Sequence, residues 1–106
     1  MSYGVVFAPE ASDQLEALLL YIAEQSSLVI AQRYTDAVIA SCEGLALFPL
    51  RGVARDDIRP GLRLTHHKGR TVMAYAVDEQ ARTVSIIGVF YGGQDYEGVL
   101  TDSRDD

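Results

Sequence analysis

The spacing of hydrophobic and polar residues predicts a strand followed by a helix at the start of the chain. Residues 3–8, YGVVFA, are rich in β-branched and aromatic side chains, which favours a strand. From Ala11 to Ile22 apolar residues recur at helical spacing, and Pro9 suits the first turn of a helix because its missing N–H would be unpaired there anyway. We therefore expect a helix over residues 9–25.

A second helical pattern follows the polar link QSS. Ser26 or Ser27 is expected to cap this helix by accepting a hydrogen bond from a free backbone N–H. Gly44 should lower the stability of the helix without ending it, whereas Phe48 should end it because it precedes Pro49. Two helices joined by so short a link are expected to pack as an antiparallel hairpin.

The second half of the chain is expected to contain a loop and then a sheet. Residues 49–61 hold two prolines and two glycines, which indicates a loop. An antiparallel meander of three strands is predicted at residues 62–67, 70–77 and 83–91. The last strand is mostly apolar, so both of its faces should be covered. Gly92 and Gly93 should end it with a sharp turn at positive φ that leaves Tyr91 reachable, and residues 96–100 should form a closing helical turn.

Together these elements predict an α+β fold with the helices on one face of the sheet. The expected order is an N-terminal strand, an antiparallel helical hairpin, a three-stranded antiparallel meander and a short C-terminal helical turn. The 106 residues suit one domain, expected over residues 1–100, with an acidic, frayed tail at residues 101–106. No apolar run reaches the roughly 18 residues of a membrane span, and the start lacks the features of a signal peptide. We therefore expect a cytoplasmic protein.

Charge is distributed unevenly along the chain. The net charge is −6, yet the segment from Arg51 to Arg70 holds six basic and two acidic residues, a local balance of +4 that leaves −10 elsewhere. Phosphate contacts dominate nucleic-acid binding, so the overall acidity argues against direct nucleic-acid binding. The basic segment could be a solvated loop and strand, or a contact patch for a target or for the acidic part of a partner.

Neither the cysteine nor the histidines predict a cofactor or metal site. Cys42 is the single cysteine and lies in a helical pattern, which favours a small core residue over a catalytic thiol. His66 and His67 are neighbours on a predicted strand, so their side chains should point to opposite faces and cannot chelate one ion together. We expect one of them to face solvent and the other to be half packed, and we expect no cofactor.

Five segments in order give the chain a family resemblance that covers nearly its whole length. They are FAPEASDQLEAL, YIAEQSSLVIAQRYTDAV, GLALFPLRG, IRPGLRLTHHKGRTVMAY and SIIGVFYGGQDYEGVL. In these segments the chain resembles the RelE/ParE superfamily of bacterial toxins, and the ParE branch more closely than the RelE branch. It departs from the pattern at Gln14, which stands where aspartate is usual, and at Gly88 and Gln94, where many relatives carry arginine.

The resemblance implies a toxin of a type II toxin–antitoxin module that a tightly bound antitoxin protein neutralises. The ParE branch is associated with inhibition of DNA gyrase, which favours a non-enzymatic toxin that binds a protein target. One alternative is a RelE-like, metal-independent endoribonuclease that cleaves mRNA on the ribosome. A second alternative is a non-toxic protein-binding module on the same fold.

A ribonuclease would need a base, an acid and a cation for the developing phosphate charge. The candidates are Arg63 as the cation and Tyr91 at the end of the last strand, but a phenol, with a reference pKa of about 10, is a poor base near neutral pH. Arg63 could equally be an exposed strand residue paired with Asp56 or Asp57. Tyr91 could instead pack beside the helices or contact a partner.

Two contact surfaces follow from these patterns. The predicted helices carry more apolar residues than one sheet-facing stripe requires, so an amphipathic antitoxin helix could lie in a groove there, unless the domain itself buries them. The antitoxin-binding candidates are Leu15, Leu19, Tyr21, Ile30, Tyr34 and Ile39. The target-contact candidates are Arg59, Arg63, Lys68, Arg70, Tyr91 and Gln94.

Overall fold

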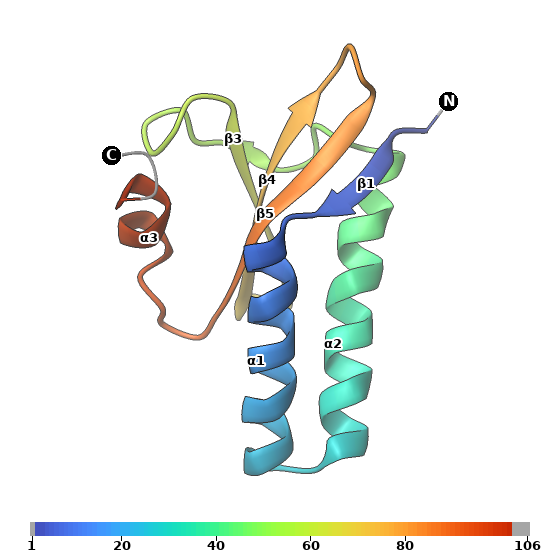
Figure 1. The fold of residues 1–106 in the computed structure, drawn as a ribbon, viewed down its shortest axis with the longest axis vertical. Coiled ribbons are helices and arrows are strands. Elements are labelled where there is room, and N and C mark those ends of the chain that lie inside the picture. Colours follow the sequence, from blue (N-terminus) through green and yellow to red (C-terminus); the bar gives the residue numbers. More distant parts are fainter. Residues whose placement is uncertain (1, 103–106) are drawn as a thin grey trace.

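The computed structural model describes residues 2–102 and confirms the expected α+β fold. The elements, in chain order, are β1 (Gly4–Phe7), α1 (Pro9–Gln25), α2 (Leu28–Glu43), a 3₁₀ turn (Gly44–Ala46), β2 (Val53–Ala54), β3 (Leu62–His67), β4 (Thr71–Asp78), β5 (Thr83–Tyr91) and α3 (Tyr96–Asp102) (Figure 1). None of the helices within residues 2–102 is long and apolar enough to span a membrane. Helix α3 extends beyond the expected domain end at residue 100, and residues 103–106 of the expected tail lie outside the described residues.

The sheet is mixed and has five strands in the order β1-β5-β4-β3-β2. The predicted meander of β3, β4 and β5 is confirmed as antiparallel. Strand β1 adds to β5 in parallel, with Gly4 opposite Thr83 and Phe7 opposite Ile86. The expected loop at residues 49–61 contains one short strand that the sequence did not reveal, because β2 is only two residues long and pairs with β3.

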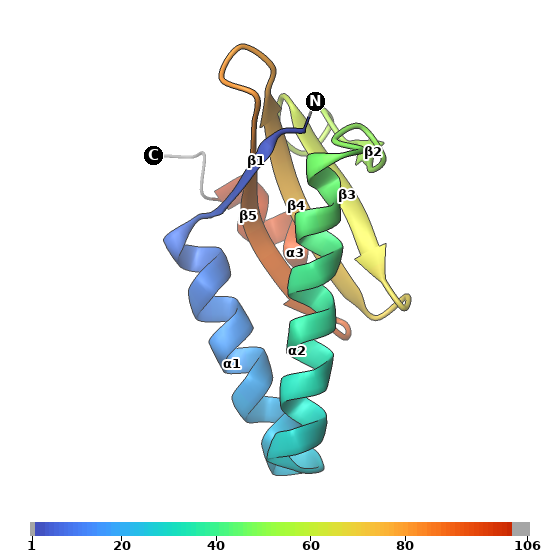
Figure 2. The ribbon, with the colours of Figure 1, turned by 90° about the vertical axis from the view of Figure 1, so that its right-hand side faces the viewer.

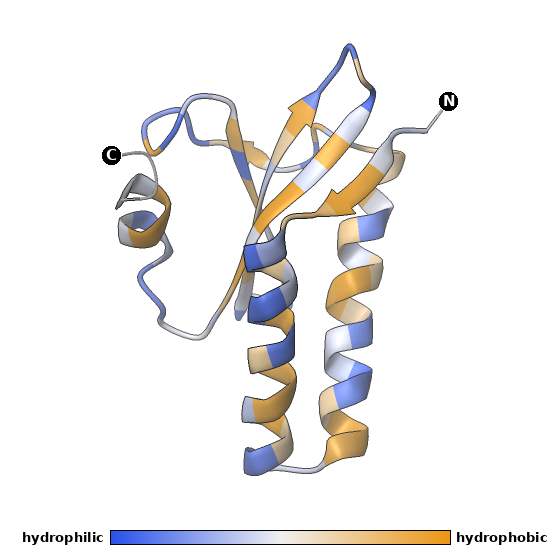
Figure 3. Ribbon diagram, in the orientation of Figure 1, coloured by the Kyte–Doolittle hydropathy of each residue, from blue (hydrophilic) through white to orange (hydrophobic). Residues whose placement is uncertain are grey.

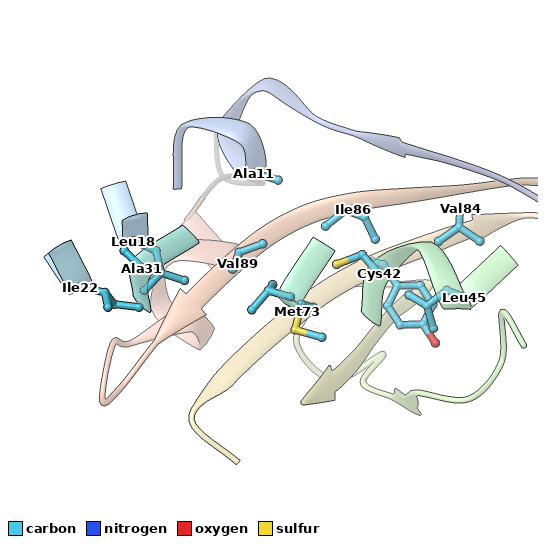
Figure 4. Close-up of a cluster of buried hydrophobic side chains, with 12 residues drawn as sticks. Ala11, Leu18, Ile22, Ala31, Cys42, Leu45, Met73, Val84, Ile86 and Val89 are labelled. Atoms are coloured by element: carbon cyan, nitrogen blue, oxygen red, sulfur yellow. The ribbon is translucent and has the colours of Figure 1, made fainter. Parts of the chain in front are cut away.

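Each face of the sheet is covered by a separate hydrophobic layer. The hairpin of α1 and α2, together with the 3₁₀ turn, covers one face, where Leu18, Cys42 and Leu45 lie against Met73 and Ile86 (Figures 2 and 4). A second cluster on the other face consists of Ile58, Leu62, Leu64, Val72, Ala74, Phe90 and Leu100. Since α3 supplies Leu100, that helix lies on the face opposite the hairpin. Strand β5 contributes to both clusters, which confirms that it is covered on both faces.

The ends of α2 show one confirmed prediction and one wrong one. Ser27 caps the helix, since its side chain accepts a hydrogen bond of 3.2 Å from the backbone N–H of Ile30. The α-helix does not continue through Gly44 to Phe48 as expected but ends at Glu43. Because glycine weakens the helix, the chain tightens there into a 3₁₀ turn, in which the Leu47 N–H donates to the Gly44 carbonyl.

Strand β5 contains one more residue than the part of β4 it faces. Ala74 lies opposite Gly88 and Tyr75 lies opposite Ile86, so Ile87 forms a β-bulge. The extra residue shifts the alternation of side chains along the strand. Beyond it, the odd-numbered residues face the helices, and these include Tyr91.

Candidate functional site

A cleft of about 510 Å³ lies beside the end of β5, next to α1. Its lining residues are Gln14, Ala17, Leu18, Tyr21, Arg70, Val89, Tyr91, Gly92, Gly93 and Gln94. Three of the predicted target-contact residues, Arg70, Tyr91 and Gln94, therefore meet here. They are joined by Tyr21, which the sequence placed on the antitoxin surface. Gly92, which borders the cleft, turns the chain at a φ of +70°, as predicted for the glycine pair.

Tyr91 packs against the helices, which is one of the two roles considered for it. Its ring centroid lies 5.9 Å from that of Tyr21 on α1 and 5.9 Å from that of Tyr34 on α2. The guanidinium carbon of Arg70 lies 5.4 Å from the Tyr91 ring centroid, a cation–π contact. The phenol is thus half-buried in a cluster of aromatic side chains.

Two glutamine side chains close the edge of β5 inside the cleft. The backbone N–H of Val89 donates to Oε1 of Gln14 at 2.7 Å. Two residues further on, the N–H of Tyr91 donates to Oε1 of Gln94 at 2.7 Å. The sequence marked Gln14 only as a departure from the family pattern, and nothing in it indicated that the side chain would reach β5.

Arg63 lies outside the cleft and supports a loop. Its guanidinium donates to the carbonyls of Leu50, at 3.2 Å, and of Gly52, at 2.6 Å. Both bonds hold the segment between the 3₁₀ turn and β2 against the sheet. A partly buried arginine with two backbone acceptors has a structural task, whatever else it contacts.

Arg63 does not pair with Asp56 or Asp57, the alternative considered for it. Asp56 accepts a hydrogen bond from the N–H of Gly61, and Asp57 forms an ion pair with Arg55 at 2.8 Å. The hydrogen bonds from Arg55 hold the pKa of Asp57 below its usual value. Both carboxylates therefore have partners within the loop that precedes β3, and Arg63 on β3 donates to backbone carbonyls instead.

The remaining target-contact candidates do not join the cleft as one patch. Arg59 donates to the carbonyl of Leu100 at 2.8 Å and thereby ties the loop before β3 to α3. Lys68 is exposed in the turn between β3 and β4, at a φ of +54°, and precedes Arg70 by two residues. The six candidates thus divide between the cleft, the β3–β4 turn and two loop-supporting arginines.

The histidines behave as their neighbouring positions predicted. His66 is exposed, whereas His67 is half-buried, with Nδ1 3.2 Å from the Ser41 hydroxyl and its ring against Tyr34. Within residues 2–102, no group of three or more histidine, cysteine, aspartate or glutamate side chains is arranged to hold a metal ion.

Cys42 is fully buried on α2, within the cluster between the hairpin and the sheet. Burial, with a smaller contribution from Glu43, raises the pKa of its thiol to about 12. The thiol therefore stays protonated near neutral pH, which suits a core residue and not a nucleophile.

The antitoxin-binding candidates divide into packed and exposed residues. Leu15, Leu19 and Tyr34 pack against the core cluster, and Ile39 is half-buried. Tyr21 and Ile30 are each 50% exposed, close to the link between the helices.

Three further large apolar side chains are exposed near that link: Leu20, Leu28 and Val29. Together with Tyr21 and Ile30 they form what we call the hairpin patch. The start of α2, which carries three of these residues, is hydrophobic in colour (Figure 3). Leu28, Val29 and Ile30 are consecutive, and one helix face cannot bury three residues in a row. This run of three apolar residues therefore indicates, from the sequence alone, that at least one of the side chains is exposed.

A second exposed apolar group was not predicted. It consists of Leu47, Phe48, Leu50 and Val53, which are between 53% and 67% exposed around the 3₁₀ turn and β2. In the sequence these residues lie at a predicted helix end and in a predicted loop, where no periodic pattern distinguishes buried from exposed side chains.

One of the comparisons with known proteins identifies a family. The sequence profile described as "ParE toxin of type II toxin-antitoxin system, parDE" matches residues 5–96. None of the curated protein sequences compared with the chain matches it.

Solved structures show the same fold at low sequence identity. A chain of the chromosomal ParDE system from P. aeruginosa is 14% identical with a TM-score of 0.73, over 86% of this chain and 97% of that one. A chain of the RelBE2 toxin–antitoxin complex from Mycobacterium tuberculosis is 23% identical with a TM-score of 0.66, over 89% and 95%. A mutant of the E. coli toxin RelE in the free state is 12% identical with a TM-score of 0.61, over all of both chains.

The profile covers most of the chain, and the solved structures share its fold. The chain therefore belongs to the ParE family of toxins of type II toxin–antitoxin systems.

Proposed function

We propose that this toxin acts by binding a protein, DNA gyrase, and that a cognate antitoxin neutralises it by covering the helical hairpin. The observation that carries the proposal is the hairpin patch on a chain of the ParE family. Monomeric proteins seldom expose large apolar side chains in a group unless another molecule binds there.

The hairpin patch suits an amphipathic antitoxin helix. Its five side chains are between 50% and 58% exposed and come from two neighbouring helices, which leaves apolar surface on both sides of the link. Covering each of them would contribute about 1 kcal/mol, given about 25 cal/mol per Å² of apolar surface removed from water. The packed candidates Leu15, Leu19 and Tyr34 would support this surface from below.

The arrangement around β5 supports binding in preference to RNA cleavage. Arg63, the candidate cation, donates to two backbone carbonyls, and Tyr91, the candidate at the strand end, packs against two other tyrosines. The cleft side chains Arg70, Tyr91 and Gln94 are then available to contact the protein target.

Three measurements test the proposal. Expression of the chain without a partner should arrest growth, and co-expression of its cognate antitoxin should restore growth. Purified toxin should inhibit supercoiling by gyrase and leave mRNA intact in a translation extract. Cleaved mRNA with unaffected gyrase would establish the ribonuclease alternative, and unimpaired growth would establish the non-toxic binding module.

A further inference from the structure

The exposed apolar group around the 3₁₀ turn and β2, which we call the turn patch, has no role in the site described so far. Its members are Leu47, Phe48, Leu50 and Val53. They are between 53% and 67% exposed, against 50% to 58% in the hairpin patch. A hollow of about 420 Å³, lined by residues 47–51, lies among them. Large apolar side chains are seldom exposed as a group unless another molecule covers them.

The backbone that carries the turn patch is held in place by hydrogen bonds. The N–H of Tyr3 donates to the carbonyl of Ala46 at 2.9 Å, and the N–H of Arg51 donates to the carbonyl of Phe48 at 3.1 Å. At its other end, Val53 is paired with β3. An ordered surface loses less conformational entropy when a partner binds, so the turn patch is suited to binding as it stands.

Arg51 adds a positive charge to the turn patch. Its side chain is exposed and borders the hollow. It forms no ion pair with any carboxylate of the described residues, and its guanidinium donates to the carbonyl of Ser41 at 3.4 Å. Arg51 also begins the basic segment that ends at Arg70, in a chain whose net charge is −6. A partner that covers Arg51 together with its apolar neighbours must therefore supply a carboxylate.

The turn patch lies at the opposite end of α2 from the hairpin patch. Helix α2 has 16 residues, so its two ends are about 24 Å apart at about 1.5 Å per residue. Figure 2 shows β2 beside the end of α2, and the link between the helices at the far end of the hairpin. An antitoxin helix on the hairpin patch therefore leaves the turn patch uncovered.

We infer that the turn patch is a docking surface for the protein target of the toxin, which meets it with an apolar surface bordered by carboxylates. The inference rests on the proposed function and gives the target a contact besides the cleft. Phe48 and Arg51 are its central side chains, since aromatic residues and arginine are enriched in the buried centres of protein interfaces. The antitoxin and the target then compete for the cleft but not for the turn patch.

Inhibition of supercoiling by purified gyrase and affinity for the cognate antitoxin, measured on the same variants, test the inference. Combining Phe48→Ser with Leu50→Ser should raise the toxin concentration for half-maximal inhibition at least about tenfold, because two apolar side chains no longer become buried. Affinity for the antitoxin should stay within about twofold, which also shows that the variant is folded. Val6→Ser, which removes an apolar side chain that is 51% exposed on β1, is the control and should change neither quantity.

The outcomes separate this inference from the proposed function. Unchanged inhibition by the double serine variant overturns the docking surface and leaves the proposed function standing. Wild-type toxin that does not inhibit gyrase overturns both. Loss of antitoxin affinity with inhibition kept would assign the turn patch to the antitoxin. A toxin dimer that the double variant dissociates in analytical ultracentrifugation would assign it to a second copy of the chain, and either result overturns the inference.

Charge reversal tests the chemistry of the partner. Arg51→Glu should weaken inhibition of gyrase at least about tenfold, since a carboxylate would then face the carboxylates of the target. Arg33→Glu makes the same change at an exposed position of α2 and should leave inhibition within about twofold of wild type. Inhibition by Arg51→Glu that equals the inhibition by Arg33→Glu overturns the acidic docking partner.

Discussion

The hydroxyl of Tyr75 on β4 accepts a hydrogen bond of 2.8 Å from the backbone N–H of Gly52, which lies in the segment before β2. Both residues are buried, so the bond fastens that segment to the centre of the sheet. Arg63 fastens the same segment by donating to the carbonyl of Gly52. The backbone on either side of one glycine is therefore held by two different strands.

Gly52→Ala should destabilise the fold. A Cβ atom at this position would lie 2.6 Å from the Tyr75 hydroxyl and 2.7 Å from the carbonyl oxygen of Leu64, which belongs to the backbone and cannot move aside alone. We expect a loss of about 1–3 kcal/mol in the free energy of unfolding, measured by urea denaturation. Gly93→Ala, where a Cβ meets nothing within 4 Å, is the control and should be nearly neutral. Equal effects at the two glycines would contradict the close packing around Gly52.

Tyr75→Phe should also destabilise the protein, for a different reason. The phenyl ring keeps the packing, but the buried N–H of Gly52 loses its acceptor. An unsatisfied buried donor costs about 1–3 kcal/mol, measurable by the same denaturation. Tyr96→Phe, which removes a hydroxyl for which no hydrogen bond is found within residues 2–102, should have less than a third of this effect. Unchanged stability in Tyr75→Phe would show that water replaces the hydroxyl.

Cys42 should make stability depend on pH in alkaline solution. Its pKa is about 12 in the fold against an ordinary value of 9.0, so between these values the unfolded chain has lost a proton that the folded chain keeps. Stability from this group is complete below pH 9 and is lost as the pH rises, by about 1.4 kcal/mol between pH 7 and pH 10. Urea denaturation of wild type and of Cys42→Ala at both pH values isolates the contribution. Parallel losses in the two proteins would refute it.

Ile30→Glu should separate toxicity from neutralisation. The side chain is half exposed in the hairpin patch, so a carboxylate there costs little in the free toxin but would be buried under an antitoxin. We expect growth arrest to persist while the antitoxin loses at least about tenfold in affinity, measured by titration calorimetry. The control is Gln32→Glu, which adds the same charge on the same helix. Full neutralisation of Ile30→Glu would remove the hairpin patch from the antitoxin interface.

Arg63→Ala should lower stability and leave the mode of action unchanged. The substitution removes the donors to the carbonyls of Leu50 and Gly52, which we expect to cost about 1–2 kcal/mol. At equal amounts of folded protein, inhibition of gyrase should stay within about twofold of wild type. Arg33→Ala, on the exposed side of α2, provides the matched loss of an arginine. If folded Arg63→Ala lost all activity while Arg33→Ala kept it, Arg63 would belong to the functional site.

The local elements could be predicted because their signals are local. Apolar spacing and Pro9 indicated α1, and Ser27 indicated the start of α2. Strand β1 was recognised, but its parallel pairing with β5 joins opposite ends of the chain and has no signature in either segment. Strand β2 was not predicted because it has only two residues, too few to show an alternating pattern.

The candidate site was predicted only in part for the same reason. Tyr91 and Gln94 are close in sequence, and the predicted antiparallel pairing of β4 with β5 brings Arg70 beside them, so the three meet in the cleft. Arg63 donates to the carbonyls of Leu50 and Gly52, in a loop distant from it in sequence. Because every residue has a backbone carbonyl, the sequence cannot indicate which ones an arginine will bind. The reach of Gln14 to Val89 depends in turn on where α1 crosses β5.

The bulge at Ile87 allows β5 to lose one residue without disturbing its end. Without Ile87, the pair Ala74–Gly88 would directly follow the pair Tyr75–Ile86, which is the regular antiparallel arrangement. Tyr91 would stay opposite Thr71 and against Tyr21 and Tyr34, and the amides that meet the glutamines would still point away from β4. A natural relative that is one residue shorter here would thus have a straighter strand and present the same surface.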